Sequence, residues 1–289
     1  MKRFLKARGE SAVMVKVDKY LNQKVNHYGI KYRLGQGAFA TIYAAEDLEK
    51  STSQQKTMVA LKIPLNKDEN YRKNMAEAEM LLGLDHPNIV RCYSIEMDRR
   101  ENIFFFVMEI VKGKDLEEII TLAGGPLSSR EVEHYGRQLL DACRYMRKNN
   151  IVHRDMKAAN VVVQDNSKGL LKIMDFGLAI NLSEWDGKGK RAGSLLYMAP
   201  EQCAGEPTYA SDIWGVGVIM YRMIIGKTPF MAHSEEELTN NITNSEPANI
   251  LDLNPKADPK LVDLIMKCLI KDHTKRYNFE DMPEPYRVE

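Results

Sequence analysis

Residues Ile151 to Val163, IVHRDMKAANVVV, are the stretch that decides the fold of this chain. Asp155 and Asn160 lie close together there, in a short loop between an apolar-periodic helix and a β-branched strand. A carboxylate and an amide held in this way can take a proton from an incoming hydroxyl and hold a metal ion on a phosphate. His, Arg and Asp also meet in ordinary polar turns, so the chemistry predicted here depends on the rest of the chain.

The composition is typical of a soluble globular protein. Of the 289 residues, 44% are hydrophobic and 28% are charged, and the formal net charge of +1 gives no reason to expect a nucleic-acid partner. The four cysteines are widely spaced without a C-x-x-C pair, which argues against a disulfide framework or a zinc site. No signal peptide is visible, and Arg222 interrupts the apolar run 216–225, so no membrane span is expected. We therefore expect a cytoplasmic protein, with the nucleus as the alternative; the oligomeric state does not follow from the sequence.

Two segments of the first third of the chain predict contacts with anions. Gly35 and Gly37 lie in a turn between two apolar runs, where they would let the backbone approach phosphate oxygens without an intervening side chain. A plain β-hairpin turn is the alternative interpretation. Met58 to Ile63, MVALKI, is typical of a buried strand, in which Lys62 is costly unless its ammonium finds an anion.

Three stretches predict helices around these segments. Residues 70–84 are compatible with a helix that turns Leu81 toward the core. Ser128 and Glu131 form a capping-box pattern, and the apolar residues that follow recur at helical spacing until shortly before the opening stretch. Asp258-Pro259 supplies a capping acid and a proline at the first helical position of a third helix.

Further motifs follow in a set order. Asp175-Phe176-Gly177 comes after a short predicted strand, and Ala199-Pro200-Glu201 closes the segment that begins there. Asp212 lies at the start of an apolar helix, and Arg276 lies near the end of the chain. With the glycine-rich turn, the strand lysine and the H-R-D stretch, this order resembles that of the eukaryotic protein kinases over roughly residues 30 to 280.

The resemblance implies an α+β fold with two lobes: a small β-rich N-lobe with one key helix, and a larger, mainly helical C-lobe. Val13, Val15 and Val17 alternate with polar residues in front of the first lobe, which fits a strand packed on the small lobe and a flexible arm equally well. The expected divisions are an N-terminal extension, the N-lobe with its hinge, the C-lobe and a short tail, at residues 1–28, 29–111, 112–281 and 282–289.

The resemblance also implies roles for individual residues. Asp155 would be the catalytic base, accepting the hydroxyl proton or orienting the nucleophile, while Lys157 would steady the γ-phosphate of ATP. Lys62 would align the α- and β-phosphates, paired with Glu77; Glu79 is the competing carboxylate, but spacing favours Glu77. The catalytic residues expected are therefore Asp155, Lys157, Asn160, Lys62 and Glu77.

ATP and Mg²⁺ are the implied cofactors, with Mn²⁺ as an alternative ion. Asn160 and Asp175 would be the metal ligands. Met108 would be the gatekeeper, the backbone of Glu109 to Val111 would be the hinge that binds adenine, and Asp115 would contact the ribose. The ATP-binding residues expected are Leu34, Gly35, Gly37, Ile42, Ala60, Lys62, Met108, Glu109, Val111, Asp115, Val162 and Asp175, of which Ile42, Ala60 and Val162 would sandwich the adenine.

Two features predict that the acceptor is a serine or threonine hydroxyl of a protein substrate. Lys157 is the choice of serine/threonine kinases, and Gly193-Ser194 ahead of the A-P-E motif is similar to the pattern of that group. Ala158-Ala159 in place of Pro-Glu superficially resembles tyrosine kinases, and Ala40 replaces the third glycine of the glycine-rich loop. Within the serine/threonine kinases, residues 126–163 look most like the autophagy-initiating kinases.

Two other functions were weighed against this one. A pseudokinase scaffold would bind ATP without turnover, but such proteins typically lose the strand lysine, the H-R-D aspartate or the D-F-G aspartate. A small-molecule phosphotransferase would not be expected to carry the pair Glu201–Arg276. In the activation segment, residues 175–201, Lys190 occupies the usual position of the phosphate acceptor, so we predict activity without phosphate on this segment. The alternative is that Ser183 serves as a displaced acceptor.

Overall fold

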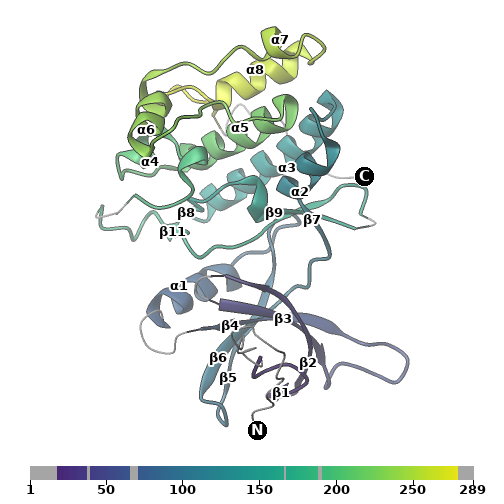
Figure 1. The fold of residues 1–289 in the computed structure, drawn as a ribbon. Coiled ribbons are helices and arrows are strands. Elements are labelled where there is room, and N and C mark those ends of the chain that lie inside the picture. The colour runs from purple at the N-terminus through teal and green to yellow at the C-terminus, as the bar shows by residue number, and fades with distance from the viewer. Residues whose placement is uncertain (1–17, 38–39, 66–70, 166, 188–190, 279–289) are drawn as a thin grey trace, which may run out of the picture.

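The structure is a computed structural model that describes residues 18–37, 40–65, 71–165, 167–187 and 191–278. It has two lobes joined by the connector 109–112, which confirms the expected bilobal α+β fold (Figure 1). The small lobe contains one helix and an antiparallel sheet of six strands in the order β1-β2-β3-β4-β6-β5. Its elements are β1 (Lys24–Val25), β2 (Tyr28–Gln36), β3 (Ala40–Asp47), β4 (Met58–Pro64), α1 (Tyr71–Leu82), β5 (Cys92–Asp98) and β6 (Ile103–Met108).

The small-lobe sheet has two faces with different neighbours, and strand β4 shows the division. Val59, Leu61 and Ile63 belong to an apolar cluster formed within the small lobe. Ala60 belongs instead to the larger cluster shared with α1 and the large lobe. Because side chains alternate along a strand, Lys62 lies on the same face as Ala60, toward α1.

The large lobe is mainly helical, with short strands along its border with the small lobe (Figure 1). β7, β9 and β10 form one small sheet in the order β10-β9-β7, and β8 pairs with β11. The elements are β7 (Gly113–Asp115), α2 (Leu116–Ala123), α3 (Ser129–Lys148), β8 (Ile151–Val152), β9 (Val161–Gln164), β10 (Leu171–Ile173), β11 (Ile180–Asn181), α4 (Pro200–Cys203), α5 (Tyr209–Ile225), α6 (Glu235–Asn244), α7 (Ile250–Leu253) and α8 (Pro259–Cys268), with 3₁₀ turns at Ala158–Asn160 and Leu195–Tyr197.

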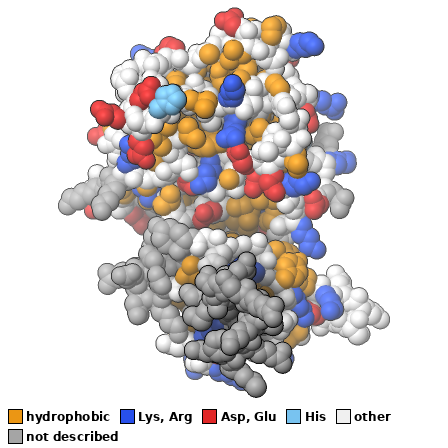
Figure 2. Space-filling model, viewed as in Figure 1, with side chains coloured by type: hydrophobic (Ala, Val, Ile, Leu, Met, Phe, Trp, Pro, Cys, Tyr) orange, Lys and Arg blue, Asp and Glu red, His pale blue; other side chains and the backbone are white. Residues whose placement is uncertain are grey.

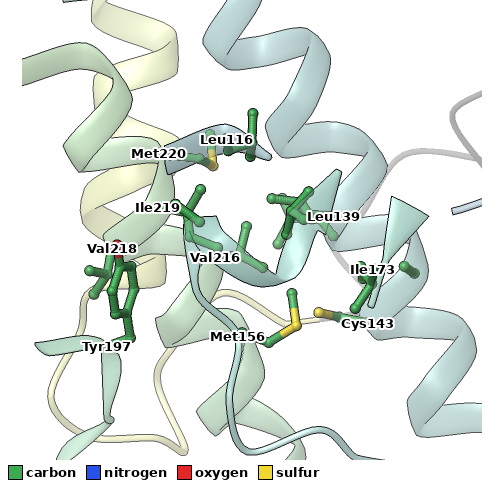
Figure 3. Close-up of a cluster of buried hydrophobic side chains, with 14 of the residues drawn as sticks. Leu116, Leu139, Cys143, Met156, Ile173, Tyr197, Val216, Val218, Ile219 and Met220 are labelled. Atoms are coloured by element: carbon green, nitrogen blue, oxygen red, sulfur yellow. The ribbon is translucent and has the colours of Figure 1, made fainter. Parts of the chain in front are cut away.

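Helix α5 forms the centre of the large lobe. Val216, Ile219 and Met220 are 0% exposed and lie near Leu139 of α3 and Leu116 of α2, which are equally buried (Figure 3). Burial on this scale is worth about 1.5–3 kcal/mol for each large side chain relative to leaving it in water. The helix therefore provides a rigid support for the loops packed on it.

One of those loops is the stretch that opened the sequence analysis, and it rests on α5 at Gly215. A Cβ on Gly215 would lie 2.7 Å from the Cβ of Met156, closer than packed carbon atoms approach. The missing side chain allows the loop backbone beside Asp155 to pack directly against the helix.

A second connection between the lobes lies at the segment 88–90. The Ile173 N–H donates to the Asn88 carbonyl at 2.8 Å, and the Val90 N–H donates to the Ile173 carbonyl at 3.0 Å. The Asn88 side chain also donates to Gln138 and to the Leu171 carbonyl, at 2.8 Å and 3.0 Å. The chain entering β5 is thereby bound to β10 and α3 of the large lobe.

Several local predictions can be compared with these elements. The capping box at Ser128 and Glu131 starts α3, and Asp258 caps α8, as predicted. The helix expected over 70–84 spans Tyr71–Leu82, and Leu81 is buried as expected. All four cysteines are free thiols. Among the described residues, no helix combines the length and apolar character needed to cross a membrane.

Some expectations are not tested by the described structure. The valine alternation at positions 13–17 and the tail 282–289 lie outside the described residues. The exact division of the chain at residues 28, 111 and 281 stays a prediction.

Candidate active site

Lys62, Glu77 and Asp175 meet where the small lobe faces the large one. The Nζ of Lys62 lies 2.5 Å from Oε1 of Glu77 and 3.8 Å from Oδ1 of Asp175. Glu77 is 6% exposed, whereas its competitor Glu79 is exposed to solvent. Glu77 thus holds the ammonium of Lys62, and the carboxylate of Asp175 lies nearby in contact with solvent. A cation in this position can bind phosphate oxygens.

Asp155 is the centre of a second group of side chains. Its Oδ2 accepts hydrogen bonds from Lys157 Nζ at 2.7 Å and from Asn160 Nδ2 at 3.0 Å. Its Oδ1 accepts from the backbone N–H of Ser194 at 2.8 Å. Lys157 Nζ also donates to Ser194 Oγ at 3.0 Å, so the H-R-D loop and the segment before the A-P-E motif share one hydrogen-bond network.

Asp212 of α5 binds the backbone of the loop that contains Asp155. Its carboxylate accepts from the backbone N–H groups of His153 and Arg154, at 2.7 Å and 3.0 Å. Burial raises the pKa of Asp212, while His153 and Arg154 favour its charged form. The bonds matter because Arg154 has a φ of +65°, a conformation that is strained for any residue but glycine.

The D-F-G residues are held by the same loop. The ring of Phe176 is 1% exposed and packs edge-on against His153, with 4.7 Å between ring centroids. His153 Nε2 lies 3.1 Å from the Met174 carbonyl. Asp175 has a φ of +52°, and its side chain is 60% exposed although the next residue, Phe176, is buried.

The remaining residues expected to bind a nucleotide lie around the connector. Ala60 pairs with Met108 across β4 and β6, and both pack in the large apolar cluster, with Ile42 against them. No described residue accepts a hydrogen bond from the Val111 N–H or donates one to the Glu109 carbonyl, so both are available to a base. Figure 2 shows hydrophobic side chains gathered between the two lobes, next to acidic and basic side chains of the large lobe.

Other residues of the expected set lie at its border. Leu34 is 44% exposed on β2. Gly35, expected in a turn, lies on the same strand opposite Ile42 of β3, and Gly37 follows the strand; residues 38 and 39 lie outside the described structure. Val162 lies on β9, which pairs with β7. Asp115 caps α2 by accepting from the Glu118 N–H at 2.8 Å. Its other carboxylate oxygen accepts no bond from a described residue.

Asn160 and Asp175 have the donor atoms that a magnesium ion requires. The Nδ2 of Asn160 donates to the Asp155 carbonyl and carboxylate, at 2.9 Å and 3.0 Å, which leaves its Oδ1 without a donor among the described residues. Asp175 offers an exposed carboxylate. Mg²⁺ is usually bound by one or two such oxygens together with water and substrate phosphates. In the described ranges, no group of three or more His, Cys, Asp and Glu side chains could hold a metal ion.

Two residues of the site were missed by the sequence analysis. Gln202 is 4% exposed and donates to the carbonyls of Arg154 and Ala192, at 2.6 Å and 2.7 Å, which binds the segment before the A-P-E motif to the H-R-D loop. Lys172 is 8% exposed and contacts Glu109 of the connector. Lys172 could have been noticed, because it is a lysine within the apolar run of a predicted strand, as Lys62 is.

Comparison with known proteins agrees with this geometry. Residues 28–285 match the family model described as the protein kinase domain, so the chain belongs to the protein kinase domain family. Serine/threonine-protein kinase ULK3 of Rattus norvegicus is 34% identical over 253 residues, which are 86% of this chain and 52% of that protein.

Two further serine/threonine-protein kinases are similar to the chain. Serine/threonine-protein kinase PrkC of Bacillus subtilis (strain 168) is 33% identical over 263 residues, 88% of this chain and 39% of that protein. Serine/threonine-protein kinase ATG1b of Arabidopsis thaliana is 32% identical over 263 residues, 89% of this chain and 36% of that protein. The chain thus spans about half or less of the length of these relatives. The expected resemblance to serine/threonine-type kinases is confirmed.

Proposed function

We propose that this chain transfers the γ-phosphoryl group of ATP to serine or threonine hydroxyls of proteins. The observation that carries the proposal is the hydrogen-bond network in which Asp155 is bound by Lys157, Asn160 and the Ser194 backbone. The names of the relatives, all serine/threonine-protein kinases, support the same acceptor class. The subcellular location that we propose is the cytoplasm.

In the proposed reaction Asp155 binds the substrate hydroxyl and accepts its proton or orients it for in-line attack. Lys157, which bridges Asp155 and Ser194, steadies the γ-phosphate next to that hydroxyl. Both groups are fixed before substrate arrives, which lowers the reorganisation that the reaction requires.

Lys62 and its partner Glu77 align the α- and β-phosphates of the nucleotide. Asn160 and Asp175 would hold Mg²⁺, which when bound neutralises charge on the phosphate oxygens. The base is held by the connector through the Glu109 carbonyl and the Val111 N–H, between Ile42 and Ala60 on one side and Val162 on the other.

The proposal is tested by Asp175→Asn and Lys62→Met in an assay that follows labelled phosphate from ATP into protein or peptide substrates. Each change removes electrostatic stabilisation of the transferred group, so we expect turnover to fall by at least about a hundredfold at saturating ATP. Glu79 is an exposed carboxylate on α1, two residues after Glu77. Glu79→Gln is therefore the matched control and should retain activity. Comparable turnover in the variants and the parent, at an unchanged melting temperature, would overturn the mechanism.

A further inference from the structure

Lys172 is a buried cation that the proposed phosphoryl transfer does not use. It lies on β10 between Leu171 and Ile173, which are both 0% exposed, and is itself 8% exposed. An ammonium in such surroundings is costly unless it is paired and hydrogen-bonded. Its partners should therefore indicate why a lysine occupies this position.

The principal partner is the connector. Lys172 Nζ lies 2.8 Å from Oε2 of Glu109, whose side chain is 20% exposed, and donates to the Ile89 carbonyl at 3.4 Å. The same Oε2 accepts from the Arg91 N–H at 3.3 Å, and the Glu109 N–H donates to the Arg91 carbonyl at 2.9 Å. Glu109 is thus fixed through its backbone N–H and its carboxylate, while its carbonyl accepts no hydrogen bond from a described residue.

The strand register places Lys172 beneath the expected base site. Lys172 lies directly opposite Val162 across β9 and β10, and directly opposed residues of an antiparallel pair point to the same face. Val162 is the residue expected to contact the adenine from the large lobe. Three residues after Lys172, the same chain reaches Asp175, so one side chain joins the strand before the metal ligand to the start of the connector.

We propose that Lys172 is a positioning residue for nucleotide binding: its ammonium holds Glu109 so that the carbonyl of Glu109 and the N–H of Val111 keep the orientation that a purine requires. The inference rests on the proposed function in one respect, namely that the connector binds the base of ATP. It goes further, because it assigns base affinity to a residue that touches neither the base nor the phosphates.

The test measures Mg-ADP affinity by calorimetry, which needs no catalytic turnover. Lys172→Met and Glu109→Gln should each weaken Mg-ADP binding by about fivefold or more, and the double variant should be no weaker than the weaker single variant, because both changes remove the same contact. In the phosphorylation assay, KM for ATP should rise in parallel while kcat stays within about twofold of the parent. Lys172→Arg, which keeps the charge, should lie closer to the parent.

Lys31→Met is the matched control. Lys31 also belongs to an ion pair, 2.7 Å from Glu46, but lies on β2 outside the nucleotide site, so its loss should leave Mg-ADP affinity unchanged. Melting temperatures are recorded for all variants, and Glu109→Gln serves as the primary test if Lys172→Met lowers that temperature strongly. A lower melting temperature with unaltered Mg-ADP affinity would overturn the positioning role of Lys172. So would a double variant in which the effects of the two changes multiply. Neither result would contradict the proposed function. A parent protein that fails to bind Mg-ADP would overturn the proposed function as well.

Discussion

Ser194 contributes to the network around Asp155 in two ways, and only one depends on its side chain. Its backbone N–H donates to the carboxylate at 2.8 Å, while its hydroxyl accepts from Lys157 at 3.0 Å. Removing the hydroxyl should therefore loosen Lys157 without releasing Asp155.

We predict that Ser194→Ala lowers kcat by about ten- to a hundredfold, the effect of losing one hydrogen bond to a charged group. Ser194→Thr retains a hydroxyl on the same backbone and is the control. Steady-state kinetics on a peptide substrate give the answer. A Thr variant that is as slow as the Ala variant would show that the hydroxyl is not the cause.

A second prediction at the scale of residues concerns which substrate sequences are preferred, and it rests on Ala159 and Leu196. Ala159 is exposed beside Asn160 and cannot pair with a cation, while Leu196 is 39% exposed on the segment next to Asp155. We expect no strong preference for arginine just upstream of the acceptor and an apolar preference just downstream. Ala159→Glu should raise kcat/KM for peptides with upstream arginine by about two- to fivefold, the range of an exposed ion pair.

A positional peptide library, read out by incorporated phosphate, tests both statements. The matched control is Ala248→Glu, a change at an exposed alanine away from the substrate site. A parent protein that selects upstream arginine would contradict the prediction.

How far single residues could be predicted depended on whether they belong to a local pattern. The H-R-D and D-F-G stretches drew attention to Asp155, Asn160 and Asp175, and the structure places Asn160 against Asp155 and Asp175 beside Lys62. Lys172 and Gln202 belong to no such pattern, because their partners are distant in the sequence. Only the packing of β10 against the connector brings the Lys172 and Glu109 side chains within 2.8 Å.

At the scale of elements, the segment after Asp175 is held by bonds within the protein. The Nε of Arg154 donates to the Leu178 carbonyl at 2.6 Å, which is a use for the arginine other than binding a phosphate. Burial lowers the pKa of Arg154, and Asp212 opposes this effect. Ser183 is exposed and donates to Asn181 Oδ1 at 2.7 Å. Lys190, at the usual acceptor position, lies outside the described residues.

We therefore predict that the kinase is active without phosphate on residues 175–201. Purified protein is treated with phosphatase, checked by mass spectrometry for an unmodified segment, and assayed. Ser183→Ala should be as active as the parent. A loss of tenfold or more on phosphatase treatment, equivalent to about 1.4 kcal/mol, that is restored by phosphate on Ser183 would contradict the prediction.

The elements that the sequence predicted best are those with a local pattern of capping or apolar residues. Capping residues and apolar periodicity mark where α3 and α8 begin, because they act within one turn of the helix. The short strands β7, β8 and β11 were not predicted, since each has at most three residues and exists only through its partner.

At the scale of the whole molecule, Glu201 and Arg276 join the A-P-E motif to the end of the large lobe. Arg276 NH1 lies 2.7 Å from Glu201 Oε1, and the two residues are 3% and 9% exposed. Burial alone would raise the pKa of Glu201, but hydrogen bonds from Arg276 and Ser211 outweigh it and hold the pKa below its usual value of 4.5. The pair therefore stabilises the fold fully above pH 4.5, and this contribution is lost as the pH falls further.

We predict that Glu201→Gln lowers the free energy of unfolding at pH 7 by about 3–5 kcal/mol, because Arg276 is left buried without its counter-ion. The difference between parent and variant should shrink as the pH is lowered below 4.5. Denaturant titrations at a series of pH values measure it. Asp263→Asn removes the partner of the exposed Lys267 on α8 and should change stability little. A difference that stays constant with pH would contradict the linkage.

Among the described residues, the chain of the small lobe is attached to the large lobe at the connector 109–112 and along segment 85–90, which is bonded to β10 and α3; Lys62 also reaches Asp175 across the gap. Two points of attachment define a line, and rotation about that line is the relative movement that breaks neither. Each part of the small lobe then travels in proportion to its distance from this axis. Strand β6 leads into the connector, β4 lies next to β6 in the sheet and β2 lies two strands further out, so Gly35 of β2 moves through a longer arc than Lys62 of β4. A nucleotide bound as proposed would then enter and leave by movement of β2 around Gly35, while Lys62 and Glu77 move together with the small lobe.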